Sequence, residues 1–244
     1  MTGPDSQPPR LSIIIPAYNE ESRLGLTLRE YVDYFRGWDG GAFEALVVLN
    51  GCRDNTRSVA DEIATAAPEV RVLEFVKPLG KGGAVWEGFA AARGEMLAFA
   101  DADNMVPAPE TAKLIEALAQ HDIAIGDRSH VPSGEGGQPP LRRLVSGLSR
   151  QWGRRFLGLP YNDTQCGAKA LRSAAWRERA PRVRERGWAF DLDLLAHAHR
   201  LGMRVAEVPV RWRHVAQGSK VRPWIDTPRA LAATFGIRRR SRRE

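Results

Sequence analysis

Two aspartates one residue apart, Asp101 and Asp103 in the stretch FADADNMVP, could together bind a cation. They directly follow an apolar run, and neighbouring carboxylates tolerate each other there only if a positive charge compensates them. Carboxylate oxygens are ligands that Mg²⁺ and Mn²⁺ prefer, and these ions keep open positions for substrate phosphates. Alternatively, Asp103 or Asn104 could merely begin a short turn before Pro107. The pair alone leaves both interpretations open.

The elements around this pair decide where it lies. Apolar runs rich in β-branched residues predict buried strands at 11–15, 44–49, 70–76 and 96–100. Helices are expected between them at 21–36, 54–66 and 81–92, followed by a helix at 110–120 and a strand at 123–126. This alternation is typical of an α/β fold with a mostly parallel sheet and helices on both faces.

Polar residues follow each of the first four predicted strands. The stretches are PAYNE (16–20), NGCRDNT (50–56), KPLGKGG (77–83) and DADN (101–104). Ligands of open parallel sheets bind beyond the carboxyl ends of the strands, so these stretches are expected to converge on one crevice. This placement favours the metal interpretation of the aspartate pair over a simple turn.

The pattern changes after Gly126. A polar loop rich in glycine and proline, at 127–140, is long enough to predict a functional segment. Segment 141–159 then places Leu, Val, Trp and Phe side chains on one helical stripe and arginines on its remaining surface. A helix at 191–201 and a strand at 204–210 follow, and Thr227 and Pro228 predict the start of a last helix.

Composition limits the class of protein. Of the 244 residues, 43% are hydrophobic and 27% are charged, as in ordinary soluble globular proteins. The net charge of +7 favours partners that carry phosphate, but no helix-turn-helix or aromatic–basic pattern indicates nucleic-acid binding. Cys52 and Cys166 form no disulfide framework, and no apolar run approaches the roughly 20 residues of a spanning helix. We expect a cytoplasmic protein, with peripheral attachment to the inner face of the cell membrane as its closest contact with lipid.

A single catalytic domain is expected at 11–237. It lies between a disordered N-terminal tail at 1–10, which lacks the features of a signal peptide, and a basic C-terminal tail at 238–244. The arginines of that tail predict a solubilising or lipid-attracting end.

The motifs together resemble those of family 2 glycosyltransferases, and most closely the polyprenyl-phosphate sugar synthases such as dolichyl-phosphate glucose and mannose synthases. The resemblance covers about residues 11–237 and rests on IIIPAYNEESRL, GCRDNT, LGKGGAVWEGFAAARGEMLAFADAD, DTQCGAK and QGSKV. It implies a nucleotide-diphospho-sugar transferase (GT-A type) fold. It also implies inverting transfer of a hexose from a nucleotide-diphosphate sugar to a polyprenyl phosphate, dependent on Mg²⁺ or Mn²⁺.

The resemblance assigns roles to individual residues. Metal and diphosphate are expected at Asp101 and Asp103, and Lys81 at a helix start packed close to the nucleotide. The other donor-binding residues implied are Pro16, Tyr18 and Glu20 around the base and ribose, and Arg213, Ser219 and Lys220 over the phosphates. The catalytic candidates are Asp103, Asp163, Asp191 and Asp193. For the last two, in FDLD, capping of a helix is the alternative to acid–base work.

Two departures from the family pattern bear on the donor. Leu49 and Asn50 stand where the family usually has two aspartates. The donor and acceptor of the Asn50 amide suit uracil, which favours UDP-glucose and leaves GDP-mannose as the alternative. Met105 replaces a glutamine of some mannose synthases, so water is expected to take a larger part in binding the metal.

The acceptor is expected to be held by arginines. Arg128, in GDRS, matches one family arginine, and Arg142 or Arg143 matches a second. Two guanidiniums would hold the phosphate of a polyprenyl phosphate, with the apolar stripe of 141–159 in an anionic membrane surface. The alternative for that stripe is an ordinary surface helix packed on the sheet.

Two other functions stay open. The first is transfer to a hydroxyl of a glycan or small metabolite, with an FDLD aspartate as base. The second is a sugar nucleotidyltransferase, which PAYNE disfavours because the glycine-rich Arg/Lys signature expected after the first strand is missing.

Overall fold

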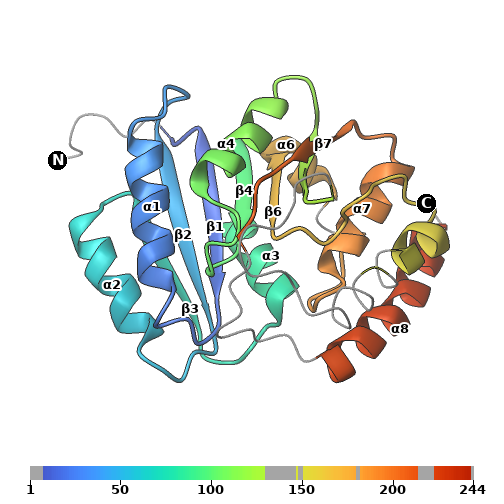
Figure 1. The fold of residues 1–244 in the computed structure, drawn as a ribbon, viewed down its shortest axis with the longest axis horizontal. Helices are drawn as coiled ribbons and strands as arrows, with labels where there is room; N and C mark the ends of the chain where they lie inside the picture. Colours follow the sequence, from blue (N-terminus) through green and yellow to red (C-terminus); the bar gives the residue numbers. More distant parts are fainter. Residues whose placement is uncertain (1–7, 130–146, 148–150, 180–181, 214–222, 243–244) are drawn as a thin grey trace.

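The computed structural model describes residues 8–129, 147, 151–179, 182–213 and 223–242. Within these residues a seven-stranded sheet forms the centre of the molecule, in the order β3-β2-β1-β4-β6-β5-β7 (Figure 1). The strands are β1 (Leu11–Ala17), β2 (Phe43–Asn50), β3 (Val70–Phe75), β4 (Met96–Ala100), β5 (Ile123–Asp127), β6 (Ala168–Arg172) and β7 (Val205–Pro209). All neighbouring pairs are parallel except those of β6, which is antiparallel to both β4 and β5.

Helices cover both faces of this sheet. They are α1 (Leu24–Arg36), α2 (Thr56–Ala66), α3 (Lys81–Ala91), α4 (Ala108–Ala117), α6 (Ser173–Arg179), α7 (Phe190–Arg200) and α8 (Pro223–Ser241). Successive strand residues point to opposite faces, so Ile13 and Ile15 pack with α1, α2 and α4 while Ile14 packs with α3 and α7. The predicted α/β fold with a mostly parallel sheet is therefore confirmed.

The central difference from the expected elements is β6, together with α6 behind it. Neither was predicted, because AKALR is short and carries a lysine, which does not resemble a buried strand. In the structure Lys169 is fully buried and pairs in register with Phe99 of β4. The strand is specified by its neighbours in the sheet and not by its own residue pattern.

The two ends of the described chain also differ from expectation. Arg10, expected in the disordered tail, donates its backbone N–H to the Ala42 carbonyl (2.8 Å). The last helix begins at Pro223, so Pro228 lies inside it and not in its first turn. Pro223 itself is the proline that suits a helix start. Because α8 continues to Ser241, no structural boundary separates 237 from 238, and the division at that point stays a prediction.

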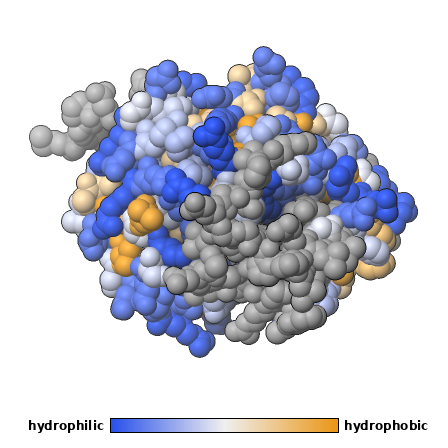
Figure 2. Space-filling model, in the orientation of Figure 1, coloured by the Kyte–Doolittle hydropathy of each residue, from blue (hydrophilic) through white to orange (hydrophobic). Residues whose placement is uncertain are grey.

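The expected amphipathic segment, 141–159, is described only at 147 and from 151 onwards, where 151–157 is helical. Trp152 and Phe156 stack at 4.9 Å, and Phe235 of α8 lies 4.7 Å from Phe156 between ring centres. We call these three residues the aromatic cluster. Trp152 is 40% exposed and Phe235 57% exposed. Outside the grey residues, Figure 2 shows a mainly hydrophilic face with a hydrophobic group at the lower left and a paler one at the right edge.

None of the helices in the described ranges is both long enough and apolar enough to cross a membrane.

Candidate active site

The loops after β1 and β2 form one wall of the candidate site. The two strands run parallel and in register, so both loops emerge at the same edge of the sheet. The Glu20 N–H donates to Thr56 Oγ1 (2.7 Å), and the Arg53 N–H donates to Asn19 Oδ1 (2.7 Å). Asp54 accepts the backbone N–H of Thr56 (3.1 Å). The motifs PAYNE and GCRDNT are therefore held together as a single rigid wall.

The residues expected around the base lie on this wall. Tyr18 is 40% exposed and Pro16 is half-buried, so an aromatic ring and an apolar ring are accessible there. Glu20 is buried and paired with Arg23, whose Nε donates to Glu20 Oε2 (2.7 Å). Tyr18 is thus the expected donor-binding side chain most open to stacking.

Asn50, expected to contact the base, also makes hydrogen bonds within the protein. Its side chain is buried, and its Nδ2 donates to the Gly80 carbonyl (3.1 Å). Its Oδ1 accepts the backbone N–H of Leu79 (2.6 Å). Both ends of the amide are engaged with the loop before α3, and one N–H and one lone pair of the amide are not used in these two bonds. Asn50 therefore anchors the loop that leads to Lys81, and its contact with the base stays a prediction.

The aspartate pair lies directly after β4, opposite the first residue of α3. The Lys81 Nζ lies 2.7 Å from Asp101 Oδ1 and donates to Asp101 Oδ2 at 2.9 Å. Burial alone would lower the pKa of Lys81, but the charges of Asp101 and Asp191 raise it overall. Burial, and then the charge of Asp101, raise the pKa of Asp103. The pair therefore carries more negative charge than Lys81 compensates.

These residues fit a hard divalent cation. Asp101 and Asp103 supply carboxylate oxygens, and the raised pKa of Asp103 shows that a nearby positive charge would stabilise its ionised form. Among the described residues, no group of three or more His, Cys, Asp or Glu side chains could hold a metal by itself. A cation held by these two aspartates would therefore take its other ligands from substrate oxygens and water.

The glycine-rich stretch before and within α3 is a packing motif. The N–H groups of Gly82 and Gly83 donate to the carbonyls of Gly187 (3.3 Å) and Arg186 (2.8 Å). A Cβ at Gly82 would lie 2.3 Å from the Phe190 side chain. These first N–H groups of α3 bind the protein's own chain, so Lys81 is the part of GKGG that reaches the site.

A half-buried arginine and a buried aspartate form the other side of the site. Arg128, just after β5, donates from Nε to Asp163 Oδ2 (2.6 Å) and from Nη2 to Asp163 Oδ1 (3.0 Å). Burial alone would raise the pKa of Asp163, but its bonds with Arg128 and the Arg128 charge lower it overall. The carboxylate is held ionised and doubly bonded, which suits orienting Arg128 better than taking up a proton.

The two FDLD aspartates both lie in the first turn of α7, but they make different contacts. Asp191 Oδ1 lies 2.8 Å from the Nζ of Lys169, and its charge acts on Lys81. Asp193 has no exposed side-chain surface, and it accepts N–H bonds from Arg184 (2.8 Å), Glu185 (2.9 Å) and Arg240 (3.2 Å). Asp191 therefore belongs with the site, whereas Asp193 ties α7 to α8 and to the preceding loop.

Some of the expected residues lie outside the described ranges: Arg142, Arg143, Ser219 and Lys220. Arg213 is described and exposed, and its backbone N–H donates to the Met105 carbonyl (2.9 Å). The chain after β7 thus passes beside the loop that carries Asp103. The sequence did not single out Gly167, whose main chain lies against Asp101, or Lys169. For Lys169 the available signal was a single charged residue in the otherwise uncharged stretch 164–171.

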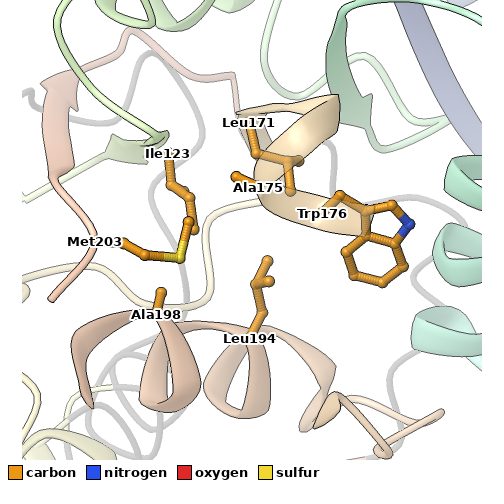
Figure 3. A pocket seen from close by; sticks show the side chains of 7 residues that line it. All are labelled: Ile123, Leu171, Ala175, Trp176, Leu194, Ala198 and Met203. Atoms are coloured by element: carbon orange, nitrogen blue, oxygen red, sulfur yellow. The ribbon is translucent and has the colours of Figure 1, made fainter. Parts of the chain in front are cut away.

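Two cavities lie near the amino ends of the parallel strands, at the end of the sheet opposite the candidate site. An apolar cavity of about 10 Å³ lies between β5, β6, α6 and α7 (Figure 3), with Ile123, the first residue of β5, in its lining. Another, of about 250 Å³, is lined by Arg10 and Met96, which lie at the starts of β1 and β4. Neither cavity includes a candidate site residue. The first is about the size of one water molecule and is lined by apolar side chains, as a packing defect would be.

Comparison with known proteins identifies the family. Residues 12–178 match the sequence profile described as glycosyl transferase family 2. The chain is similar to the dolichyl-phosphate beta-glucosyltransferase of Drosophila melanogaster, with 36% identity over 93% of this chain and 74% of that protein. It is also similar to the Saccharomyces cerevisiae dolichyl-phosphate beta-glucosyltransferase, with 30% identity over 89% of this chain and 70% of that protein.

Solved structures agree with the fold. Glucosyl-3-phosphoglycerate synthase from Mycobacterium tuberculosis, in complex with UDP, superposes with a TM-score of 0.68 and 22% identity, over 94% of this chain and 80% of that chain. The same enzyme with Mn²⁺, UDP-glucose and phosphoglyceric acid gives a TM-score of 0.67 at 22% identity, over 94% of this chain and 79% of that chain. The chain therefore belongs to glycosyl transferase family 2 and is a glycosyltransferase.

Proposed function

We propose that this protein transfers glucose from UDP-glucose to a polyprenyl phosphate, with inversion at the anomeric carbon. The observation that carries the proposal is the joint placement of a carboxylate pair and the half-buried Arg128 at one edge of the sheet. The names of the related dolichyl-phosphate glucosyltransferases support this choice of donor sugar and acceptor class.

The donor side is formed by Asp101, Asp103 and Lys81. The two aspartates would hold Mg²⁺ or Mn²⁺, and such a cation takes up negative charge on the departing diphosphate. Lys81, which is half-buried beside Asp101, adds a positive charge near the same phosphates. Tyr18 would stack on the base, and Arg213, whose backbone is bonded to Met105 of the Asp103 loop, would add a positive charge near the phosphates. The solved neighbour with Mn²⁺ and UDP-glucose supports the choice of UDP over GDP.

The acceptor side is formed by Arg128. Its Nε and Nη2 are bonded to Asp163, and Nη1 takes no part in that pair. Burial alone would lower the pKa of Arg128, but neighbouring negative charges, those of Asp163 and Asp101 among them, raise it overall. The arginine is therefore charged and close to the donor side, as needed to bring an acceptor phosphate to the anomeric carbon. Arg142 or Arg143 would complete the phosphate site.

A phosphate acceptor agrees with the state of the carboxylates. Such an acceptor is already anionic at neutral pH, so no base has to remove a proton from it. Asp163 and Asp193 are engaged in ion pairs and hydrogen bonds, as a reaction without a general base allows. Transfer to a hydroxyl is the second candidate, and the observation that favours it is Asp191, a carboxylate that is paired with Lys169 and whose charge also acts on Lys81 at the donor side.

We propose that the aromatic cluster contacts an anionic membrane surface at the inner face of the cell membrane. Trp152 and Phe235 expose aromatic surface, and the Arg238 guanidinium lies 4.6 Å from the Phe156 ring centre. Exposed aromatic rings beside arginines are suited to the interface between lipid headgroups and acyl chains. This surface would keep the enzyme where its lipid acceptor is.

The test is a transfer assay with a donor panel. Purified enzyme is given UDP-glucose, UDP-galactose or GDP-mannose with Mn²⁺, with and without a polyprenyl phosphate, and both the glycolipid and the released nucleotide are measured. Of the three donors, we expect only UDP-glucose to give glycolipid, when polyprenyl phosphate is present. In excess chelator we expect no glycolipid. UDP release that requires a soluble hydroxyl compound, with no glycolipid formed, would replace the proposal with the second candidate.

A further inference from the structure

The segment 163–169, DTQCGAK, contacts both sides of the proposed site. It leads into β6, which lies antiparallel between β4 and β5. The chain leaves β4 at Asp101 and leaves β5 at Arg128. The segment before β6 therefore passes between the donor side and the acceptor side.

On the donor side, the main chain of Gly167 lies directly against Asp101. The Asp101 N–H donates to the Gly167 carbonyl (3.2 Å). A Cβ added at Gly167 would lie 2.0 Å from Asp101 Oδ2 and 2.6 Å from its Cγ. No side chain larger than glycine leaves room for the Asp101 carboxylate in its present place. The direction of that carboxylate is thus set by Gly167 together with Lys81.

On the acceptor side, Asp163 determines the orientation of Arg128. The Asp163 side chain is only 2% exposed, and both of its oxygens are bonded to the guanidinium. A bidentate pair fixes the plane of the guanidinium as well as its position. Arg128 also lies over the Trp212 ring at 5.9 Å, so its plane is held from two sides.

The segment ends in a third contact. The Nζ of Lys169 donates to the Cys166 carbonyl (2.8 Å) and lies 2.8 Å from Asp191 Oδ1. This fully buried lysine holds the segment's own turn and ties it to the first turn of α7. The contacts of Lys169 therefore stabilise the conformation of residues 163–169, which are suited to act as a rigid spacer.

We propose that residues 163–169 position the two substrates relative to each other, with Gly167 setting the Asp101 carboxylate and Asp163 setting the Arg128 guanidinium. Asp163 is then a positioning residue and neither the acid nor the base. The acceptor half of this inference, which concerns Arg128 and Asp163, rests on the proposed function because it assumes a polyprenyl phosphate acceptor. Its donor half depends only on how the protein binds nucleotide and metal.

The donor half is tested with Gly167→Ala. Calorimetry measures the binding of UDP with Mn²⁺ and the binding of UDP in chelator. We expect the affinity with Mn²⁺ to fall about tenfold or more, since displaced metal ligands typically cost this much, and the affinity in chelator to stay unchanged. Gly37→Ala is the matched control, because its Cβ would meet only the Tyr34 carbonyl, at 3.7 Å. Unchanged Mn²⁺-dependent binding in Gly167→Ala would overturn the inference.

The acceptor half is tested with Asp163→Asn. We expect the KM for polyprenyl phosphate to rise about tenfold to a hundredfold, as for a misplaced substrate-positioning group, while Mn²⁺·UDP binding is unchanged. The double variant Arg128→Ala/Asp163→Asn should be no slower than Arg128→Ala, because Asp163 acts through Arg128.

The remaining outcomes also decide the inference. Loss of Mn²⁺·UDP binding in Asp163→Asn, equal to that in Gly167→Ala, would mean that the segment only stabilises the fold, and the inference fails. An additive loss in the double variant would show that Asp163 acts on its own, and again the inference fails. If the wild-type enzyme does not use polyprenyl phosphate, the proposed function is wrong, and the Gly167→Ala calorimetry still decides the inference.

Discussion

Replacing Asn50 by alanine tests whether this amide reads the base or anchors the loop. The substitution removes the bond to the Gly80 carbonyl and the bond from the Leu79 N–H. Each such bond contributes about 1 kcal/mol net to stability, so the variant should lose about 2 kcal/mol. Leu79 and Gly80 are half-buried, so water can reach them and a larger penalty is not expected. For a chain of this size, that loss corresponds to a fall in Tm of about 4–8 °C.

The anchoring role also predicts how nucleotide binding changes. The loop that Asn50 holds leads directly into Lys81, which contacts Asp101. A loosened loop should weaken the binding of UDP and GDP by the same factor, because the proposed partner of Lys81 is the diphosphate, which both nucleotides share. Calorimetry with each nucleotide and Mn²⁺, together with thermal unfolding, measures both effects. A selective loss of UDP affinity with an unchanged Tm would refute the anchoring role and restore the base-reading interpretation.

Three further predictions concern the metal, the pH dependence of stability and the membrane. Asp103→Ala should abolish transfer while Tm stays near that of the wild type, since among the described residues the side chain accepts a hydrogen bond from the Met105 N–H alone. Transfer assays and thermal unfolding check this, and residual Mn²⁺-dependent activity would contradict it. Burial alone would raise the pKa of Glu44, but bonds from Ser12, Arg93 and Arg71 lower it overall. Glu44 therefore stabilises the fold above the ordinary carboxyl pKa, and this contribution is lost as the pH falls through the lowered value. Denaturant unfolding of Glu44→Gln should show lower stability at neutral pH and a flatter decline in acid, whereas an unchanged pH dependence would exclude the effect. The double variant Trp152→Ser/Phe235→Ser should bind anionic vesicles less well in sedimentation assays but keep its activity on a short prenyl phosphate in solution; undiminished vesicle binding would remove the aromatic cluster from the membrane contact.

Local patterns were sufficient for most of the fold. The apolar runs that predict β1, β2, β4 and β5 are buried on both faces, and their length and β-branched content follow from that position, whereas β3 at the edge of the sheet is mostly half-buried. Polar stretches after these strands indicated the edge of the site, because parallel strands present their carboxyl ends on one side. Asp101, Asp103 and Lys81 were identified in this way, and the structure places them in contact or close together.

Partnerships between distant residues could not be predicted in this way. The Asn50 amide has a donor and an acceptor, which suit a base or a backbone loop equally well. The choice depends on a loop 29 residues further along the chain. Likewise, Asp163 could be a base in the sequence, but in the fold it pairs with Arg128, 35 residues away, and is held ionised.

The strand β6 shows the same limit at the level of an element. The sequence by itself determined the alternation of strands and helices, the position of the carboxylate pair and the family motifs. Only the tertiary structure decided that a strand containing lysine lies in the middle of the sheet, because the charge of Lys169 is tolerated there only beside Asp191. A residue pattern records how each segment can fold, whereas the free energy of a buried charge or amide depends on which group from elsewhere in the chain faces it.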